Sequence, residues 1–322
     1  MNHRYFYKMS EENFVNITLQ ETVCTKNCSL NQTIVNQSTC RFVPEIRYLL
    51  TCCVVLSILC AYFVSIVYSC ISEFRNLHGK ILISISLCLG TFYTTLLLGV
   101  YLRPFISYSI CVLFGTIIYI VFIASFYWTN ALSYDIWRGL TNKTLLSITH
   151  HRRQYLKYSI YAWIMTILTS IPMIIVQNTS TIERFHPRLG NPFCWIVERE
   201  AKLIYLSLPV GLILASNAIM FVMTMKTLVK ANDTACILQL NQHRSNIKLY
   251  LKLYLVMGLL WMSDFIYAIY PECYLQLTID FICSLHGVFL FLVYICKENV
   301  IKKLFKFQGN GGDSASNTLQ LS

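Results

Sequence analysis

Histidine and carboxylate side chains are the groups in this 322-residue sequence that could hold a metal ion or move a proton. A zinc hydrolase would need three histidines and an acid at helical spacing, because zinc takes tetrahedral sites built from such ligands. The 7 histidines are dispersed instead, and His150 and His151 are adjacent, which keeps them off one helical face. We therefore expect no enzyme activity, no metal site and no cofactor.

The composition predicts that helices in a membrane position these side chains. The sequence is 56% hydrophobic and only 13% charged, with a mean hydropathy of +0.54, whereas an ordinary soluble domain is about a quarter charged. Several apolar stretches reach the roughly 20 residues that a helix needs to cross a bilayer. They cover residues 48–71, 81–102, 107–137, 155–176, 203–228, 249–270 and 275–296. We predict an all-α membrane protein, a seven-transmembrane helix bundle.

The charges of the loops predict the orientation of this bundle. With seven spans, 16 of the 26 Lys and Arg residues fall on one side, and basic residues gather on the cytoplasmic face. Five acceptor sites for N-glycosylation fall on the other side, at Asn16, Asn27, Asn31, Asn36 and Asn178. Two more, at Asn142 and Asn232, fall on the predicted cytosolic side, and we expect these to be chance matches. We expect a multi-pass protein of the plasma membrane with its N-terminus outside.

Three regions follow from this layout. Residues 1–46 are expected to form a short, glycosylated, Cys-containing extracellular segment, and residues 47–297 the seven-transmembrane domain. Residues 298–322 are expected to begin with an amphipathic helix on the cytoplasmic surface of the bilayer, because Val300, Ile301, Leu304 and Phe305 share an apolar face.

Two cysteines are placed to form a disulfide. In the predicted orientation Cys111 lies near the outer end of the third span and Cys194 in the second outer loop, so both face an oxidising compartment. We expect them to pair, which would make a rigid rim over the space between the helices. A free Cys194, or a Cys194–Cys273 pair, remains open.

Ionisable residues within spans are costly and often functional. Asp264 could line an outer pocket or pair between helices, and Asp280 suits either a pocket or a wet position near the headgroups. Arg103 is a candidate counter-charge, and Trp195 suits the rim of the same pocket.

Several motifs resemble a known family. They are "FRNLHGK" (74–80), "FYWTNALSYDIW" (126–137), "YSIYAW" (158–163), "LPVGLILASNAIMF" (208–221), "LYLKLYLVMGLLW" (249–261) and "LHGVFLFLVYICKENV" (285–300). In register over about residues 40 to 307, they resemble the insect Methuselah-like branch of the secretin-type G-protein-coupled receptors. The sequence departs from the family in a shortened ectodomain, in the residues after Trp163, and in His286, where the family has glutamine.

The resemblance implies a receptor that transmits an extracellular, peptide-like signal to a heterotrimeric G protein. It places His78 in a polar cluster that holds the inactive state closed, with Arg75 and Asp135 as neighbours. The candidate switch and bending positions are Arg75, His78, Asp135, Asn217, Pro209, Gly258, His286 and Gly287. The candidates for the G-protein-facing surface are Arg138, Arg152, Arg153 and Lys248.

Two other functions fit part of the pattern. A seven-span chemoreceptor channel would have a cytosolic N-terminus, opposite to the orientation that the charges predict. A receptor-like remnant without signalling is compatible with the shortened ectodomain and the altered fourth span. We expect the lipid bilayer, a ligand and a G protein as partners, and no nucleic acid.

Overall fold

The computed structural model describes residues 44–141, 148–179, 183–190, 194–196, 198–232, 273–296 and 300. The long helices are α1 (Pro44–Cys70), α2 (Leu77–Leu102), α3 (Tyr108–Thr141), α4 (Ile148–Asn178) and α6 (Leu208–Asn232). The shorter pieces are η1 (Ser72–Phe74), η2 (Glu183–Phe185), α5 (Arg199–Ala201), η3 (Lys202–Ser207), α8 (Cys273–Ser284) and α9 (His286–Tyr294). The described residues hold no strand, and the fold is all-α.

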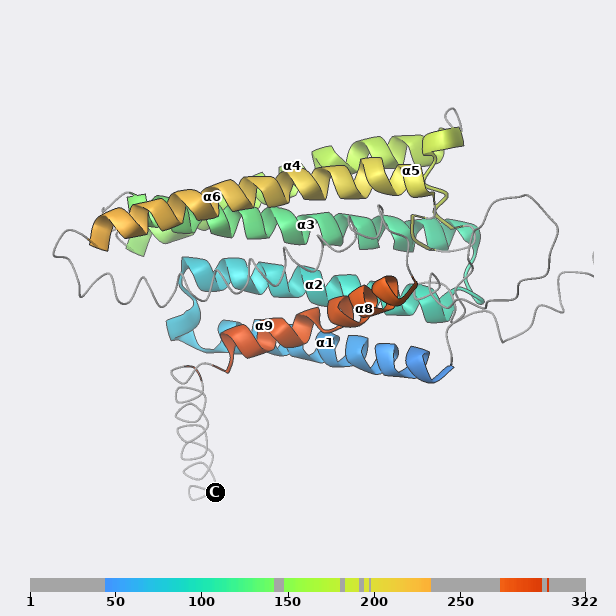
Figure 1. The fold of residues 1–322 in the computed structure, drawn as a ribbon, viewed down its shortest axis with the longest axis horizontal. Coiled ribbons are helices and arrows are strands. Elements are labelled where there is room, and N and C mark those ends of the chain that lie inside the picture. The colour runs from blue at the N-terminus through green and yellow to red at the C-terminus, as the bar shows by residue number, and fades with distance from the viewer. Residues whose placement is uncertain are drawn as a thin grey trace, which may run out of the picture.

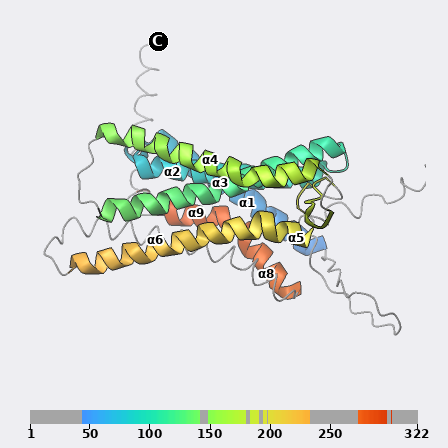
Figure 2. The same cartoon turned by 90° about the horizontal axis from the view of Figure 1, so that it is seen from above.

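The apolar stretches form helices long enough to cross a membrane. Among the described residues five qualify alone, and α8 with α9 makes a sixth if the pair, bent by 42°, is one span. Figure 1 shows the long helices lying side by side along the longest axis of the molecule, and Figure 2 shows α8 turning away from the line of α9. The predicted span 249–270 lies outside the described residues, as do Gly258 and Asp264 within it.

The third span is the centre of the bundle. α3 packs against α2, α4 and α6, while α1 packs against α2 and α9. Large side chains of α3 fill the interior, among them the fully buried Tyr119, Phe122, Phe126 and Trp128. α4 instead presents exposed apolar residues such as Ile164 and Leu168, which is the arrangement expected of a helix that faces lipid.

The bundle has two chemically different ends, which we name by their contacts. The disulfide end holds Cys111, at the start of α3, bonded to Cys194. The cluster end holds His78, at the start of α2, and Asp135, near the end of α3. The two ends are separated by most of the length of α3 (Figure 1).

The fifth span widens before its proline. Residues Lys202–Ser207 form a π-helical segment, and Pro209 follows in the first turn of α6. The Tyr119 hydroxyl donates a hydrogen bond of 2.6 Å to the carbonyl of Tyr205 inside this segment. The sequence predicts that Pro209 can kink this span, and the π-helical segment directly before it is a second irregularity of the regular ladder of helical hydrogen bonds.

Candidate functional site

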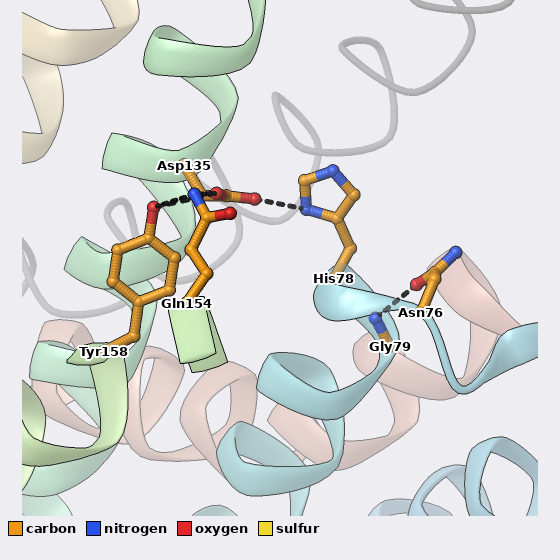
Figure 3. A network of polar contacts seen from close by, with 6 residues as sticks. All are labelled: Asn76, His78, Gly79, Asp135, Gln154 and Tyr158. Carbon is orange, nitrogen blue, oxygen red and sulfur yellow. Dashed lines mark hydrogen bonds and ion pairs between the residues drawn. The ribbon is translucent and has the colours of Figure 1, made fainter. Parts of the chain in front are cut away.

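A buried carboxylate joins three helices at the cluster end. Asp135 on α3 is 6% exposed, and one of its oxygens lies 3.0 Å from Nδ1 of His78 on α2. Its other oxygen accepts hydrogen bonds from the Tyr158 hydroxyl at 2.8 Å and from Gln154 Nε2 at 3.3 Å, both on α4 (Figure 3). A buried charge requires such partners, so this cluster fixes the relative positions of α2, α3 and α4.

Local structure brings His78 to the cluster. The Asn76 side chain caps α2 by accepting a hydrogen bond of 2.8 Å from the amide of Gly79, and His78 therefore lies in the first helical turn (Figure 3). Arg75 lies exposed before this cap and makes none of the cluster contacts found among the described residues. The Arg138 side chain lies beside the Tyr158 hydroxyl. Arg152 and Arg153 are exposed near the start of α4.

A second polar contact lies in the middle of the bundle. Asn130 on α3 donates to Asn217 Oδ1 on α6 at 2.9 Å and to Ser216 at 3.2 Å. It accepts a hydrogen bond of 2.8 Å from Tyr161 on α4. Asn217 is 1% exposed, and its Nδ2 has no hydrogen-bond partner among the described residues.

The break between α8 and α9 is satisfied partly by its own residues and partly by other helices. The last four carbonyls of a helix have no partner within it, and here all four accept hydrogen bonds. The carbonyls of residues 281 and 282 accept from the Ser284 hydroxyl and the Leu285 amide. The carbonyl of Cys283 accepts from the Tyr93 hydroxyl of α2, and that of Ser284 from the Ser57 hydroxyl of α1, each at 2.5 Å.

The first residues of α9 are buried against α1. His286 is fully buried, and both of its ring nitrogens lack a hydrogen-bond partner among the described residues. Gly287 lies against the backbone of Ser57, so close that a Cβ atom would meet the Ser57 carbonyl oxygen. Glycine is therefore the residue that lets α1 and α9 approach here.

The predicted disulfide is present at the disulfide end, with the Cα atoms of Cys111 and Cys194 4.9 Å apart. A side chain of α4 holds the same loop independently. Gln177 accepts a hydrogen bond of 3.0 Å from the Leu189 amide and donates one of 3.3 Å to the Leu189 carbonyl. Arg103, predicted as a counter-charge, donates to the Gly190 carbonyl at 2.8 Å. The loop is thus tied to α2, α3 and α4.

Trp195 reaches into the bundle, deeper than the rim position that the sequence suggested. The ring is half-buried and packs edge to face on Phe92 of α2 and Phe122 of α3, with centroids 6.3 and 6.2 Å away. These two phenylalanines are themselves in contact, at 5.1 Å. The loop therefore places an aromatic residue between the second and third spans.

The remaining predicted positions are scattered or fall outside the description. Asp280 is half-buried on α8, and Asn178 is exposed at the end of α4. Residues 16, 27, 31, 36 and 248 lie outside the described residues. Sequence reasoning missed Tyr158, Gln154 and Gln177, for which the available signal was a polar side chain near the end of an apolar stretch.

Comparison with known proteins agrees with this architecture. The family described as 7 transmembrane receptor (Secretin family) matches residues 43–290. "Probable G-protein coupled receptor Mth-like 2" of Drosophila melanogaster is 28% identical over 85% of this chain and 56% of its own length. "G-protein coupled receptor Mth" of the same species is 26% identical over 87% of this chain and 56% of its own length.

A third relative, "G-protein coupled receptor Mth2" of Drosophila yakuba, is 25% identical over 73% of this chain and 46% of its own length. The chain spans about half the length of the curated relatives it matches. The family match covers the helical bundle from the start of α1 into α9. The chain therefore belongs to the secretin family of seven-transmembrane receptors and resembles its Methuselah-like members.

Proposed function

We propose that the chain is a plasma-membrane receptor that transmits an extracellular signal, carried by a peptide, to a heterotrimeric G protein. The disulfide end is the outer, ligand-facing end in this proposal, and the cluster end faces the cytoplasm. The observation that carries it is the contact of Asp135 with His78, Tyr158 and Gln154. A buried carboxylate shared by three helices can hold one helix arrangement, and an agonist acts by favouring another.

The residues around the cluster support a cytoplasmic role for this end. Arg138 lies beside Tyr158, and Arg152 and Arg153 are exposed on the adjoining start of α4. Basic residues of this kind meet anionic lipid and favour the cytoplasmic face. In the proposal they also border the cavity that a G protein enters when the cluster opens.

The test is basal signalling through a panel of G-protein dissociation sensors in cells with matched surface expression. Asp135→Asn removes the charge that His78 and Tyr158 share, and we expect it to raise basal signalling in the sensor that the wild type engages. Tyr127→Phe is the control, because it removes a neutral contact with Thr169 between the same two helices. Silence of wild type and Asp135→Asn in every sensor would favour a remnant without signalling.

Orientation is tested separately by an epitope placed before α1. We expect antibody to stain intact cells and the segment to carry N-linked sugar that a glycosidase removes. Staining only after the membrane is made permeable would overturn the proposed orientation and favour the chemoreceptor class.

A further inference from the structure

We propose that Tyr93 is a positioning residue that couples the disulfide-bonded loop to the bend in the last span. The proposal deepens the receptor function and rests on it for its signalling meaning. The coupling itself is a property of the helix bundle, and it can be measured without a ligand or a G protein.

The first step is the contact between Tyr93 and the bend. The Tyr93 hydroxyl donates a 2.5 Å hydrogen bond to the carbonyl of Cys283, one of the last carbonyls of α8. A carbonyl at a helix end lies beyond the regular ladder of helical hydrogen bonds, and backbone polar groups within a bilayer have to be satisfied by other groups of the protein. Tyr93 is 4% exposed, and this hydrogen bond stabilises the bent arrangement over a straight one.

The second step joins Tyr93 to the loop. Its ring packs edge to face on the neighbouring Phe92, with centroids 4.9 Å apart. Phe92 contacts Trp195 of the loop, and both contact Phe122 of α3. Aromatic pairs in this geometry contribute beyond simple burial. A displacement of Trp195 therefore moves Phe92, and with it the ring whose hydroxyl holds the bend.

The third step is the rigidity of both ends of this chain of contacts. The loop is fixed by the Cys111–Cys194 disulfide and by the two hydrogen bonds between Gln177 and Leu189. On the other side, Ser57 donates to the Ser284 carbonyl next to the one that Tyr93 holds. Coupling requires an element with two discrete arrangements, and the bend of α8 against α9 is that element.

The test is hydrogen–deuterium exchange, followed by mass spectrometry, of the full chain in lipid nanodiscs. Tyr93→Phe keeps the ring and removes the hydroxyl, and we expect exchange in peptides covering residues 283–289 to rise roughly tenfold, because a lost hydrogen bond favours local opening. Tyr62→Phe is the matched control, since its hydroxyl contacts the Thr94 hydroxyl between α1 and α2 and not a carbonyl of the bend. We expect that control to leave these peptides unchanged.

The coupling is measured by combining this change with one in the loop. Trp195→Ala should raise exchange in the same peptides, Trp195→Phe should raise it less, and Trp195→Ala should add nothing once Tyr93→Phe is present. Additive effects, equal effects of Tyr93→Phe and Tyr62→Phe, or faster exchange throughout the bundle would each overturn the proposal. Silent G-protein sensors beside a measured coupling would refute the signalling function and leave the positioning role supported.

Discussion

Two tyrosine hydroxyls between α3 and α4 allow a hydrogen bond to the Asp135 carboxylate to be compared with a neutral one. The Tyr158 hydroxyl donates a hydrogen bond of 2.8 Å to the Asp135 carboxylate, whereas the Tyr127 and Thr169 hydroxyls share a neutral hydrogen bond of 2.7 Å. Interhelical hydrogen bonds in membranes average about 0.6 kcal/mol and reach about 1.7 kcal/mol, and those to charged groups are the stronger ones. We expect Tyr158→Phe to cost about 1.5 kcal/mol and Tyr127→Phe about 0.6 kcal/mol.

The assay is the free energy of unfolding from a denaturing-detergent titration of the purified chain in mixed micelles. The expected difference between the two variants, about 1 kcal/mol, is roughly a fivefold change in the unfolding equilibrium constant. Both rings keep their edge-to-face neighbours, Tyr134 for Tyr158 and Tyr161 for Tyr127. The comparison therefore isolates the hydroxyl groups.

Repeating the Tyr158→Phe measurement in an Asp135→Asn background identifies the source of this difference in unfolding free energy. In Asp135→Asn the side chain still accepts a hydrogen bond but carries no charge, so the cost of Tyr158→Phe should fall to about that of a neutral contact, ~0.6 kcal/mol. Equal losses for Tyr158→Phe and Tyr127→Phe, or an unchanged loss in the Asn background, would show that the carboxylate charge does not strengthen the cluster.

Three further predictions concern the rest of the bundle. Gly287→Ala places a methyl group against the Ser57 backbone. It should lower the unfolding free energy by about 1–3 kcal/mol, measured in the same titration, and an unchanged free energy would refute the close approach of α1 and α9. Cys194→Ser opens a disulfide across 83 residues, worth up to ~4.5 kcal/mol, and should reduce heat resistance. The control Cys70→Ser, at an exposed free cysteine, should change it little. Asn178→Gln should abolish one glycosidase-sensitive mobility shift; an unchanged band pattern would contradict glycosylation there.

The spans could be predicted because the bilayer makes length and apolarity decisive. Six of the predicted stretches coincide with α1, α2, α3, α4, the α5–α6 segment and the α8–α9 pair, although most of these helices extend further than their apolar stretch. The extra turns carry polar residues such as His78 and Gln154, which apolarity alone assigns to loops. The residues at which the helices begin and end could therefore be predicted less well than the existence of the helices.

The composition of the cluster was only partly predictable. Asp135 was expected beside His78, and the structure brings the two to 3.0 Å. Tyr158 and Gln154 were not foreseen, because their reach to Asp135 depends on the rotation of α4 about its own axis, which a weakly amphipathic, mostly lipid-facing helix does not reveal in its sequence. Arg75 was expected in the cluster and lies exposed instead.

The bend at Leu285 shows the same limit. No proline marks it, and the hydroxyls that satisfy it come from Ser57 and Tyr93, more than a hundred residues away in the chain. Sequence reasoning noted Gly287 as a site of close approach or bending, and it could not say which helix would approach.

The π-helical segment before α6 changes how the fifth span should be compared with other sequences. A turn that contains one additional residue rotates everything beyond it by roughly 100° relative to an uninterrupted α-helix. A single helical wheel drawn through residues 199–232 would therefore misplace Asn217, which contacts Asn130, relative to the residues before Lys202. A sequence that folds without the wide turn would need one residue fewer at Lys202–Ser207 to keep the same face inward.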